Sequence, residues 1–140
     1  MSEFNTNNIN TNINTSKYNS LKQYEQIYDI TFSEEYYELE NTFLDIANSK
    51  EIIIDRYDLT NSKILFLLGV HYEHDTKNYD EMKKWYLMAI ELKHTDSMYN
   101  LAKYYKKNKN YNLMEKYCLM AIESKSSKSM NYLGLYYWDD

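Results

Sequence analysis

The sequence contains no proline and only two glycines among its 140 residues. These residue types make most of the tight turns in β-sheet proteins, so a turn-rich β fold is disfavoured. A single cysteine, Cys118, leaves no internal disulfide. No stretch approaches the roughly 18 apolar residues of a membrane span, and the N-terminal MSEFNTNN lacks the apolar segment of a secretory signal. We therefore expect an intracellular, cytoplasmic protein that is helical, has no disulfides and does not contact a membrane.

Tyrosine is abundant, with 17 copies, and the composition is 44% hydrophobic and 26% charged. This balance suits one globular domain, or one domain with a tail. The formal net charge of −5 argues against general binding of nucleic acid, because phosphate groups attract a positive surface.

The first third of the chain changes character at about residue 20. Residues 1–20 are rich in Asn, Thr and Ser, so we predict a disordered tail, passive or acting as a tether.

Residues 21–60 predict a helical N-terminal cap or a divergent repeat, with one helix over 21–30 and a second capped by Ser33. Residues 51–57, EIIIDRY, indicate a linker or a short helix. The apolar positions of the second helix share one face: Tyr36, Leu39, Phe43, Leu44 and Ala47.

The rest of the chain repeats itself. LMAIELKHTDSMYNLAKYY at 87–105 returns as LMAIESKSSKSMNYLGLYY at 119–137, displaced by 32 positions. The pattern predicts an all-α arrangement of antiparallel helices over 61–138, with repeats at 61–94 and 95–126 and a partial one at 127–138. The expected helices are 61–74, 79–93, 97–107, 111–124 and 129–138.

Small and apolar residues recur at matching positions of the repeats. Gly69, Ala102 and Gly134 share one column, where we expect a neighbouring helix to approach closely. Ala89 and Ala121 share another, each the last member of a trio at i, i+4 and i+7 that lies on one helical face. The predicted repeat core comprises Leu68, Gly69, Tyr72, Tyr86, Ala89, Leu101, Ala102, Tyr105, Cys118, Ala121, Leu133, Gly134 and Tyr137.

The pattern resembles the tetratricopeptide signature and, more closely, the Sel-like repeat. Trp85-Tyr86-x2-Ala89-Ile90-Glu91 runs through His94 to Leu101-Ala102-x2-Tyr105, similar to W-Y-x2-A-A-E-x-G-H followed by L-G-x2-Y. The resemblance implies an α-solenoid of helix-turn-helix repeats, about two and a half in number, that binds proteins or peptides. The Asn/Tyr/Lys-rich style also resembles repeat proteins of large DNA viruses, which would place the chain in the host cytoplasm.

By analogy with tetratricopeptide arrays, the first helices of successive repeats would line a groove for the partner. Exposed aromatic and aliphatic residues there would anchor a peptide or protein. The predicted groove residues are Phe66, Val70, Glu73, Tyr99, Lys103, Lys106, Asn131, Leu135 and Trp138.

No set of residues predicts catalysis or a cofactor. His71 and His74 lie near Glu73 and Asp75, but without a third ligand at matching spacing we interpret them as a solvated helix end rather than a metal site. Cys118 replaces an aromatic residue in its column, which favours a buried thiol over a nucleophile. The lysines at 103–109 interleave with two tyrosines and leave nucleic acid as a weaker alternative.

We therefore predict a non-catalytic protein-interaction module or scaffold. The alternatives are a nucleic-acid-associated helical protein and a shortened repeat without a specific function. We also expect weak self-association through the C-terminal helix, where Leu135 and Trp138 add apolar surface.

Overall fold

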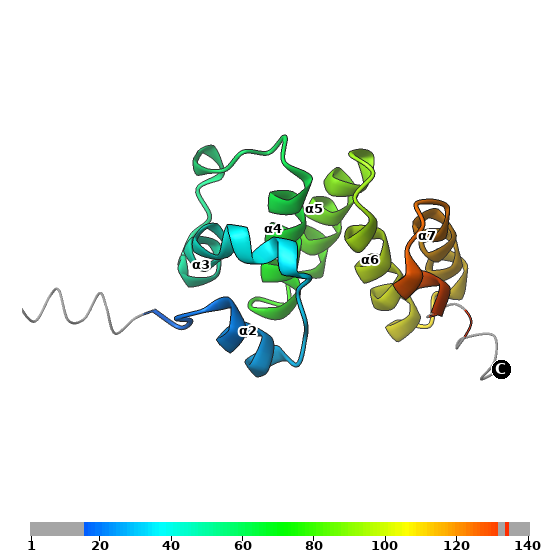
Figure 1. Cartoon of the computed structure of the whole chain (residues 1–140), viewed down its shortest axis with the longest axis horizontal. Helices are drawn as coiled ribbons and strands as arrows, with labels where there is room; N and C mark the ends of the chain where they lie inside the picture. Colours follow the sequence, from blue (N-terminus) through cyan, green and yellow to red (C-terminus); the bar gives the residue numbers. More distant parts are fainter. Residues whose placement is uncertain (1–15, 132–133, 135–140) are drawn as a thin grey trace, which may run out of the picture. The chain divides into compact units, whose positions relative to one another are not determined.

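The computed structural model describes residues 16–131 and 134, and this part of the chain contains helices and no strand (Figure 1). The prediction of an all-α protein is confirmed to that extent. The chain divides into two compact units, Met1–Asp58 and Leu59–Asp140.

Over residues 16–58, the first unit contains two α-helices, α2 (Leu21–Tyr28) and α3 (Glu40–Asn48), and two 3₁₀ helices, η1 (Glu34–Leu39) and η2 (Ile54–Arg56). The single helix expected after Ser33 is therefore wrong in detail, since it begins as η1 and becomes α-helical only at Glu40. Ser33 makes no side-chain capping bond, which removes the contact that would have started an α-helix there. The stretch 51–57, predicted as a linker or a short helix, contains the short 3₁₀ helix η2.

An aromatic cluster forms the core of this unit around Tyr24. The Tyr24 ring centroid lies 4.7 Å from that of Phe43 and 4.8 Å from that of Tyr18, both in edge-on geometry. Glu25 is buried beside them and accepts hydrogen bonds from the Phe32 N–H and the Tyr37 hydroxyl, each at 2.6 Å. The buried carboxylate is thus satisfied by its own unit.

The tail predicted over residues 1–20 ends earlier than expected. Tyr18 is buried, its N–H donates to Asn48 Oδ1 at 2.9 Å, and Asn48 Nδ2 donates to the Tyr18 carbonyl at 2.9 Å. Ser20 caps α2 by accepting from the Gln23 N–H. Residues 1–15 lie outside the described part of the chain.

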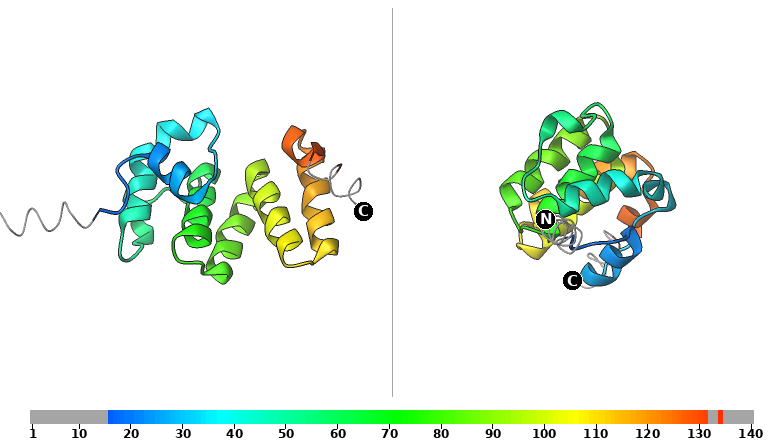
Figure 2. Two further views of the ribbon diagram at one scale, coloured as in Figure 1. Left: turned by 90° about the horizontal axis from the view of Figure 1, so that it is seen from below. Right: turned by 90° about the vertical axis from the view of Figure 1, so that its left-hand side faces the viewer.

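Between residues 59 and 126, the second unit contains four α-helices of equal length: α4 (Ser62–His74), α5 (Tyr79–Glu91), α6 (Thr95–Lys107) and α7 (Tyr111–Glu123). A further helical segment begins at residue 127 and is described to residue 131. Successive helices run antiparallel, and α4 packs on α5, α5 on α6 and α6 on α7 (Figure 2). The four helices lie within two residues of their predicted bounds.

A lysine in the left-handed backbone region marks the end of every one of these helices. Lys77, Lys93, Lys109 and Lys125 have φ of 51°, 66°, 61° and 66° and stand sixteen residues apart. At the last three, the following N–H reaches back to the helix, as His94 N–H does to the Ala89 carbonyl at 3.1 Å. This is the hydrogen bond of a Schellman ending, which usually places glycine where these lysines stand. A chain with two glycines thus uses lysine, whose charge complements the helix C-terminus.

The residue after each of these lysines caps the next helix. Asn78 accepts from the Glu81 N–H at 3.2 Å and Asn110 from the Leu113 N–H at 3.3 Å. His94 Nδ1 accepts from the Ser97 N–H at 3.2 Å. Ending and starting signals therefore occupy two adjacent residues, and this keeps the connectors short.

Small residues allow the paired helices to approach. Gly69, Ala89, Ala102 and Ala121 are all buried. Gly134 is exposed, and a Cβ added there would meet nothing within 4 Å. The expectation of a close approach at Gly134 is therefore wrong over the described residues.

Candidate functional site

A salt bridge joins the first helices of two successive repeats, so these helices lie side by side on one face of the second unit. Lys128 Nζ lies 3.5 Å from Asp96 Oδ1, and the two residues are 32 positions apart in the sequence. They occupy the same column of the repeat with opposite charges. The pair joins α6 to the segment that begins at residue 127.

Two lysines lie near the ring of Tyr99 on this face. Lys103 Nζ is 4.7 Å and Lys128 Nζ 5.9 Å from the centroid of the Tyr99 ring, both within cation–π range. Tyr99 is half-buried, and burial raises the pKa of its hydroxyl. Desolvation of the Lys103 ammonium group lowers its pKa, and the negative charge of Glu73 opposes this shift. The residue as a whole is exposed.

A polar network connects three helices beside Tyr99. The Tyr86 hydroxyl on α5 donates to Glu73 Oε1 on α4 at 2.7 Å, and Asn100 Nδ2 on α6 donates to the Tyr86 oxygen at 3.2 Å. Tyr86 is itself fully buried. The network fixes the positions of Glu73 and Asn100 and thereby holds the polar part of this face in place. We call Glu73, Asp96, Tyr99, Lys103 and Lys128 the Tyr99 cluster.

Two of the predicted groove residues are not at the surface. Phe66 and Val70 are buried, with 5% and 1% of their surface exposed. The Phe66 ring stacks on Tyr86 at 5.7 Å between centroids and lies 5.1 Å from the His94 ring. Their proposed role as exposed anchors is therefore corrected to one in packing.

The remaining groove predictions meet different outcomes. Glu73, Tyr99 and Lys103 come together in the Tyr99 cluster. Lys106 is half-buried and Asn131 is exposed. Leu135 and Trp138 lie outside the described residues, as do Leu133 and Tyr137 of the predicted core.

Sequence reasoning missed Asp96, Asn100 and Lys128. Asp96 and Lys128 carried a detectable signal, because opposite charges in one column of neighbouring repeats fall side by side. Asn100 carried none, since its role depends on the position of a hydroxyl on another helix. Apart from the exposed Gly134, the other predicted core residues are buried or, in the case of Tyr72 and Tyr105, half-buried.

The C-terminal end of α4 is not the solvated end that the sequence suggested. His71 is buried, and its Nδ1 lies 2.8 Å from Asp75 Oδ2, with 6% and 3% of the two side chains exposed. Burial lowers the pKa of the neighbouring His74, against the opposing effect of Glu73. Among the described residues, no three His, Cys, Asp or Glu side chains are grouped as metal ligands would be.

Cys118 is fully buried, with its Sγ 3.9 Å from Met114 Sδ. Desolvation, with a smaller contribution from Glu115, raises the pKa of its thiol to about 11. The thiolate that a nucleophile requires is therefore disfavoured at neutral pH.

The interleaved lysines and tyrosines near the end of α6 are engaged with their neighbours. Tyr104 lies 5.3 Å from Tyr79 and 5.3 Å from Tyr105 between ring centroids. Tyr105 stacks on Tyr117 at 5.9 Å. These rings form a ladder between helices.

No protein-family model matches this sequence, and no curated protein or solved structure matches it either. A search of the described helices finds none that is long and apolar enough to cross a membrane.

Proposed function

We propose that the second unit is a non-catalytic protein-interaction module, a short α-solenoid of tetratricopeptide-like or Sel-like repeats. Its partner is a peptide or protein segment that lies on the face formed by α4, α6 and the helical segment from residue 127. The observation that carries the proposal is Tyr99, a half-buried aromatic ring on this face with two lysine ammonium groups within cation–π range.

The Tyr99 cluster favours a partner with a carboxylate next to an apolar side chain. A partly exposed aromatic ring offers a large contact area at a small loss of side-chain entropy. Asp96 neutralises Lys128 across the repeats, whereas the Lys103 ammonium contacts the Tyr99 ring and shows no ion pair among the described residues. A carboxylate from the partner would form an ion pair with the Lys103 ammonium group. This ion pair would be stronger than one in water, because the ammonium group is already partly desolvated.

Preorganisation supports the same conclusion. Glu73 and Asn100 are both held by the buried Tyr86 hydroxyl, so a partner would not have to order them. Binding to groups that are already fixed loses less conformational entropy than binding to mobile ones.

The test is selection from a displayed random peptide library against the full-length protein, with counter-selection on the double variant Tyr99→Ser, Lys103→Ser. We expect the recovered peptides to be enriched in Asp or Glu beside an apolar residue. Fluorescence anisotropy of these peptides should show binding to the wild type that weakens with salt, because an exposed ion pair is screened.

The control is Tyr111→Ser with Lys107→Ser, an exposed tyrosine and an exposed lysine elsewhere in the same unit. It should bind the selected peptides as the wild type does. Equal binding to both double variants would place the site elsewhere. Retention on single-stranded nucleic acid that disappears in the Tyr99 variant would favour the nucleic-acid alternative.

A further inference from the structure

The second helices of the two repeats carry the same four residues on one outward side. On α5 these are Lys84, Leu87, Met88 and Glu91. On α7 they are Lys116, Leu119, Met120 and Glu123. Their spacing of i, i+3, i+4 and i+7 places each set along one side of its helix. We call each set a KLME stripe.

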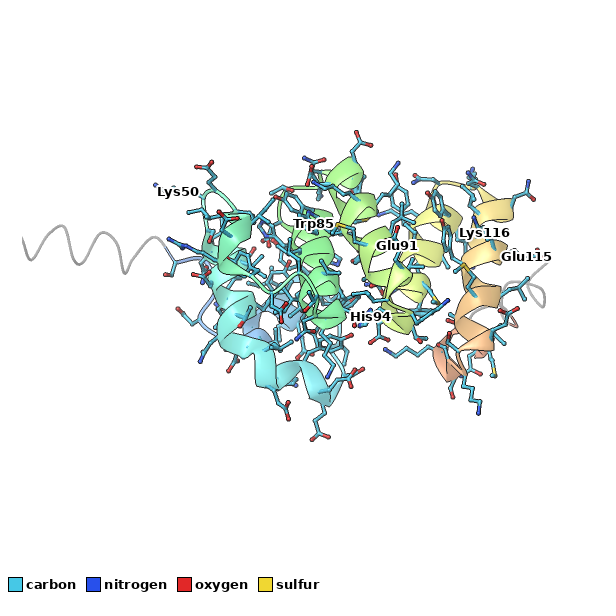
Figure 3. The ribbon with its side chains drawn as sticks, turned by 90° about the horizontal axis from the view of Figure 1, so that it is seen from above. Lys50, Trp85, Glu91, His94, Glu115 and Lys116 are labelled. Atoms are coloured by element: carbon cyan, nitrogen blue, oxygen red, sulfur yellow. The ribbon has the colours of Figure 1, made fainter. Side chains whose placement is uncertain are left out.

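The stripes reach solvent. The lysine, leucine and glutamate of both stripes are exposed, and the methionines are half-buried. Leu87 and Leu119 expose 39% and 45% of their surface. Figure 3 labels Glu91 on α5 and Lys116 on α7 among these side chains.

The two stripes have identical residues, whereas much of the rest of the accessible surface of these helices differs between the repeats. Tyr79 and Tyr111 also match, but several other accessible positions of α5 and α7 differ between the repeats. Asp80 corresponds to Asn112, Lys83 to Glu115 and Leu92 to Ser124. Buried identities such as Ala89 and Ala121 follow from helix packing, whereas an accessible leucine is not required by the fold of either repeat.

The two glutamates stand at positions where their own helix disfavours them. Glu91 and Glu123 are the last residues of α5 and α7, and the negative end of the helix dipole repels a carboxylate. Neither forms an ion pair within the described residues. Lys84 and Lys116 have a local contact, at 4.9 Å over the Trp85 ring and 5.3 Å over the Tyr117 ring. In the part of the chain that the structure describes, no ion pair or other polar contact accounts for the leucines and glutamates.

The charges of each stripe are complementary to those of the same stripe running in the opposite direction. Each stripe has a cation at its N-terminal end, a carboxylate two turns later and apolar side chains between them. When two such helices pack antiparallel, the lysine of each faces the glutamate of the other, about 10 Å along the helix from its own glutamate. A two-fold axis across the helices therefore satisfies both ends of both stripes at once.

We propose that the KLME stripes form a dimer interface, on which α5 and α7 of a second copy of this chain pack antiparallel against α5 and α7. Leu87 and Leu119 are buried by the partner and provide the affinity, since exposed ion pairs contribute little. The lysines and glutamates set the orientation. This inference does not depend on the proposed peptide site, because none of its residues belongs to the Tyr99 cluster.

The first test is sedimentation velocity of the full-length protein over a hundredfold concentration range. We expect a concentration-dependent dimer whose dissociation constant rises at least about tenfold in the double variant Leu87→Ser, Leu119→Ser. Ile27→Ser is the control, because it removes an apolar side chain of the first unit that is more exposed, at 53%, than either leucine. Far-UV circular dichroism checks that each variant keeps its helices. A wild type that stays monomeric overturns the proposal.

The second test uses the charges. A variant with Lys84→Glu and Lys116→Glu and a variant with Glu91→Lys and Glu123→Lys should each fail to dimerise alone, because like charges then face each other. Mixed in equal amounts, the two should form a heterodimer. Absence of that heterodimer, or a wild-type dimer lost only in Leu135→Lys with Trp138→Lys, contradicts the assignment to α5 and α7.

Discussion

The Tyr86 ring occupies the space in which a side chain at Gly69 would lie. A Cβ built on Gly69 would stand 2.4 Å from both Cδ1 and Cε1 of Tyr86, well inside van der Waals contact. The next repeat has Ala102 in the column of Gly69 and Cys118 in that of Tyr86. Glycine accompanies the large tyrosine ring in one repeat, and alanine accompanies the smaller cysteine in the next. Each repeat therefore fills the same space with a different pair of residues.

Gly69→Ala should destabilise the protein by roughly 1–3 kcal/mol through overpacking, although alanine is the better helix former. In the background of Tyr86→Cys, the same change should cost much less, because the ring is gone. Urea unfolding of the four proteins gives the coupling free energy between the two sites. Additive effects would show that Tyr86 moves away without cost. Ala102→Gly, which removes a methyl group without creating a clash, is the control.

Replacement of a left-handed lysine by glycine should stabilise the protein. Lys93 has φ 66°, where a non-glycine residue costs about 1–2 kcal/mol, while glycine adds about 0.5–1 kcal/mol of unfolded-state entropy. The net gain expected for Lys93→Gly is therefore about 0–1.5 kcal/mol. Lys83→Gly, inside α5, should instead lose about 1 kcal/mol. Thermal unfolding distinguishes the two, and equal losses would mean that the charge of Lys93 matters more than its backbone.

Helix positions were predictable because their signals are local. The bounds of α4 to α7 follow from apolar spacing, from asparagine or histidine at each start and from the 32-residue register. The four left-handed lysines were not predicted, since lysine has no preference for that backbone region and only the repeated connector selects it. Likewise, nothing in the sequence separates η1 from α3, because the difference depends on the absence of a capping bond at Ser33.

The candidate site was predicted in part. Helical spacing places Tyr99 and Lys103 on one face, and these two do lie together. The same spacing placed Phe66 and Val70 on the equivalent face of α4, where the structure buries them. Spacing states which side of a helix a residue occupies, but it does not state what else packs on that side.

Stability should fall as the solution is acidified below about pH 6.5, in part through His74. Burial lowers the pKa of His74 below its ordinary value of 6.5, and Lys103 and Lys107 act in the same direction, whereas Glu73 and Asp75 oppose them. The unfolded chain therefore binds a proton at this residue before the folded chain does, and stability is lost as pH falls through 6.5 toward the folded-state pKa. The contribution is fully present above pH 6.5.

Urea unfolding at several values between pH 5 and 8 measures this dependence. His74→Gln should flatten the acid side of the curve by up to about 1.4 kcal/mol per pH unit and leave the neutral side unchanged in slope. His71 and His94 are present in both proteins, so the difference between the curves isolates His74. Two parallel curves would show that the folded and unfolded states bind this proton equally.

Ala121→Phe should destabilise the protein by about 1–3 kcal/mol or more, because Ala121 has no exposed surface and α7 packs closely on α6. Leu119→Phe is the control on the same helix, since 45% of the Leu119 surface is exposed and a larger ring can extend into solvent there. Thermal unfolding at low protein concentration compares the two. An unchanged transition in Ala121→Phe would mean that the helices can separate at no cost.

Deletion of residues 1–20 should lower the stability of the first unit, whereas deletion of residues 1–15 keeps every contact described for Tyr18 and Ser20. Loss of the buried Tyr18 ring should cost roughly 3 kcal/mol, and loss of the Ser20 cap about 1 kcal/mol more. Tyr18→Ala in the full-length chain should reproduce most of the effect, because the ring packs on Tyr24 at 4.8 Å. Urea unfolding followed by tyrosine fluorescence measures all three. Equal stability of the two truncated proteins would show that the paired hydrogen bonds between Tyr18 and Asn48 form without contributing to the fold.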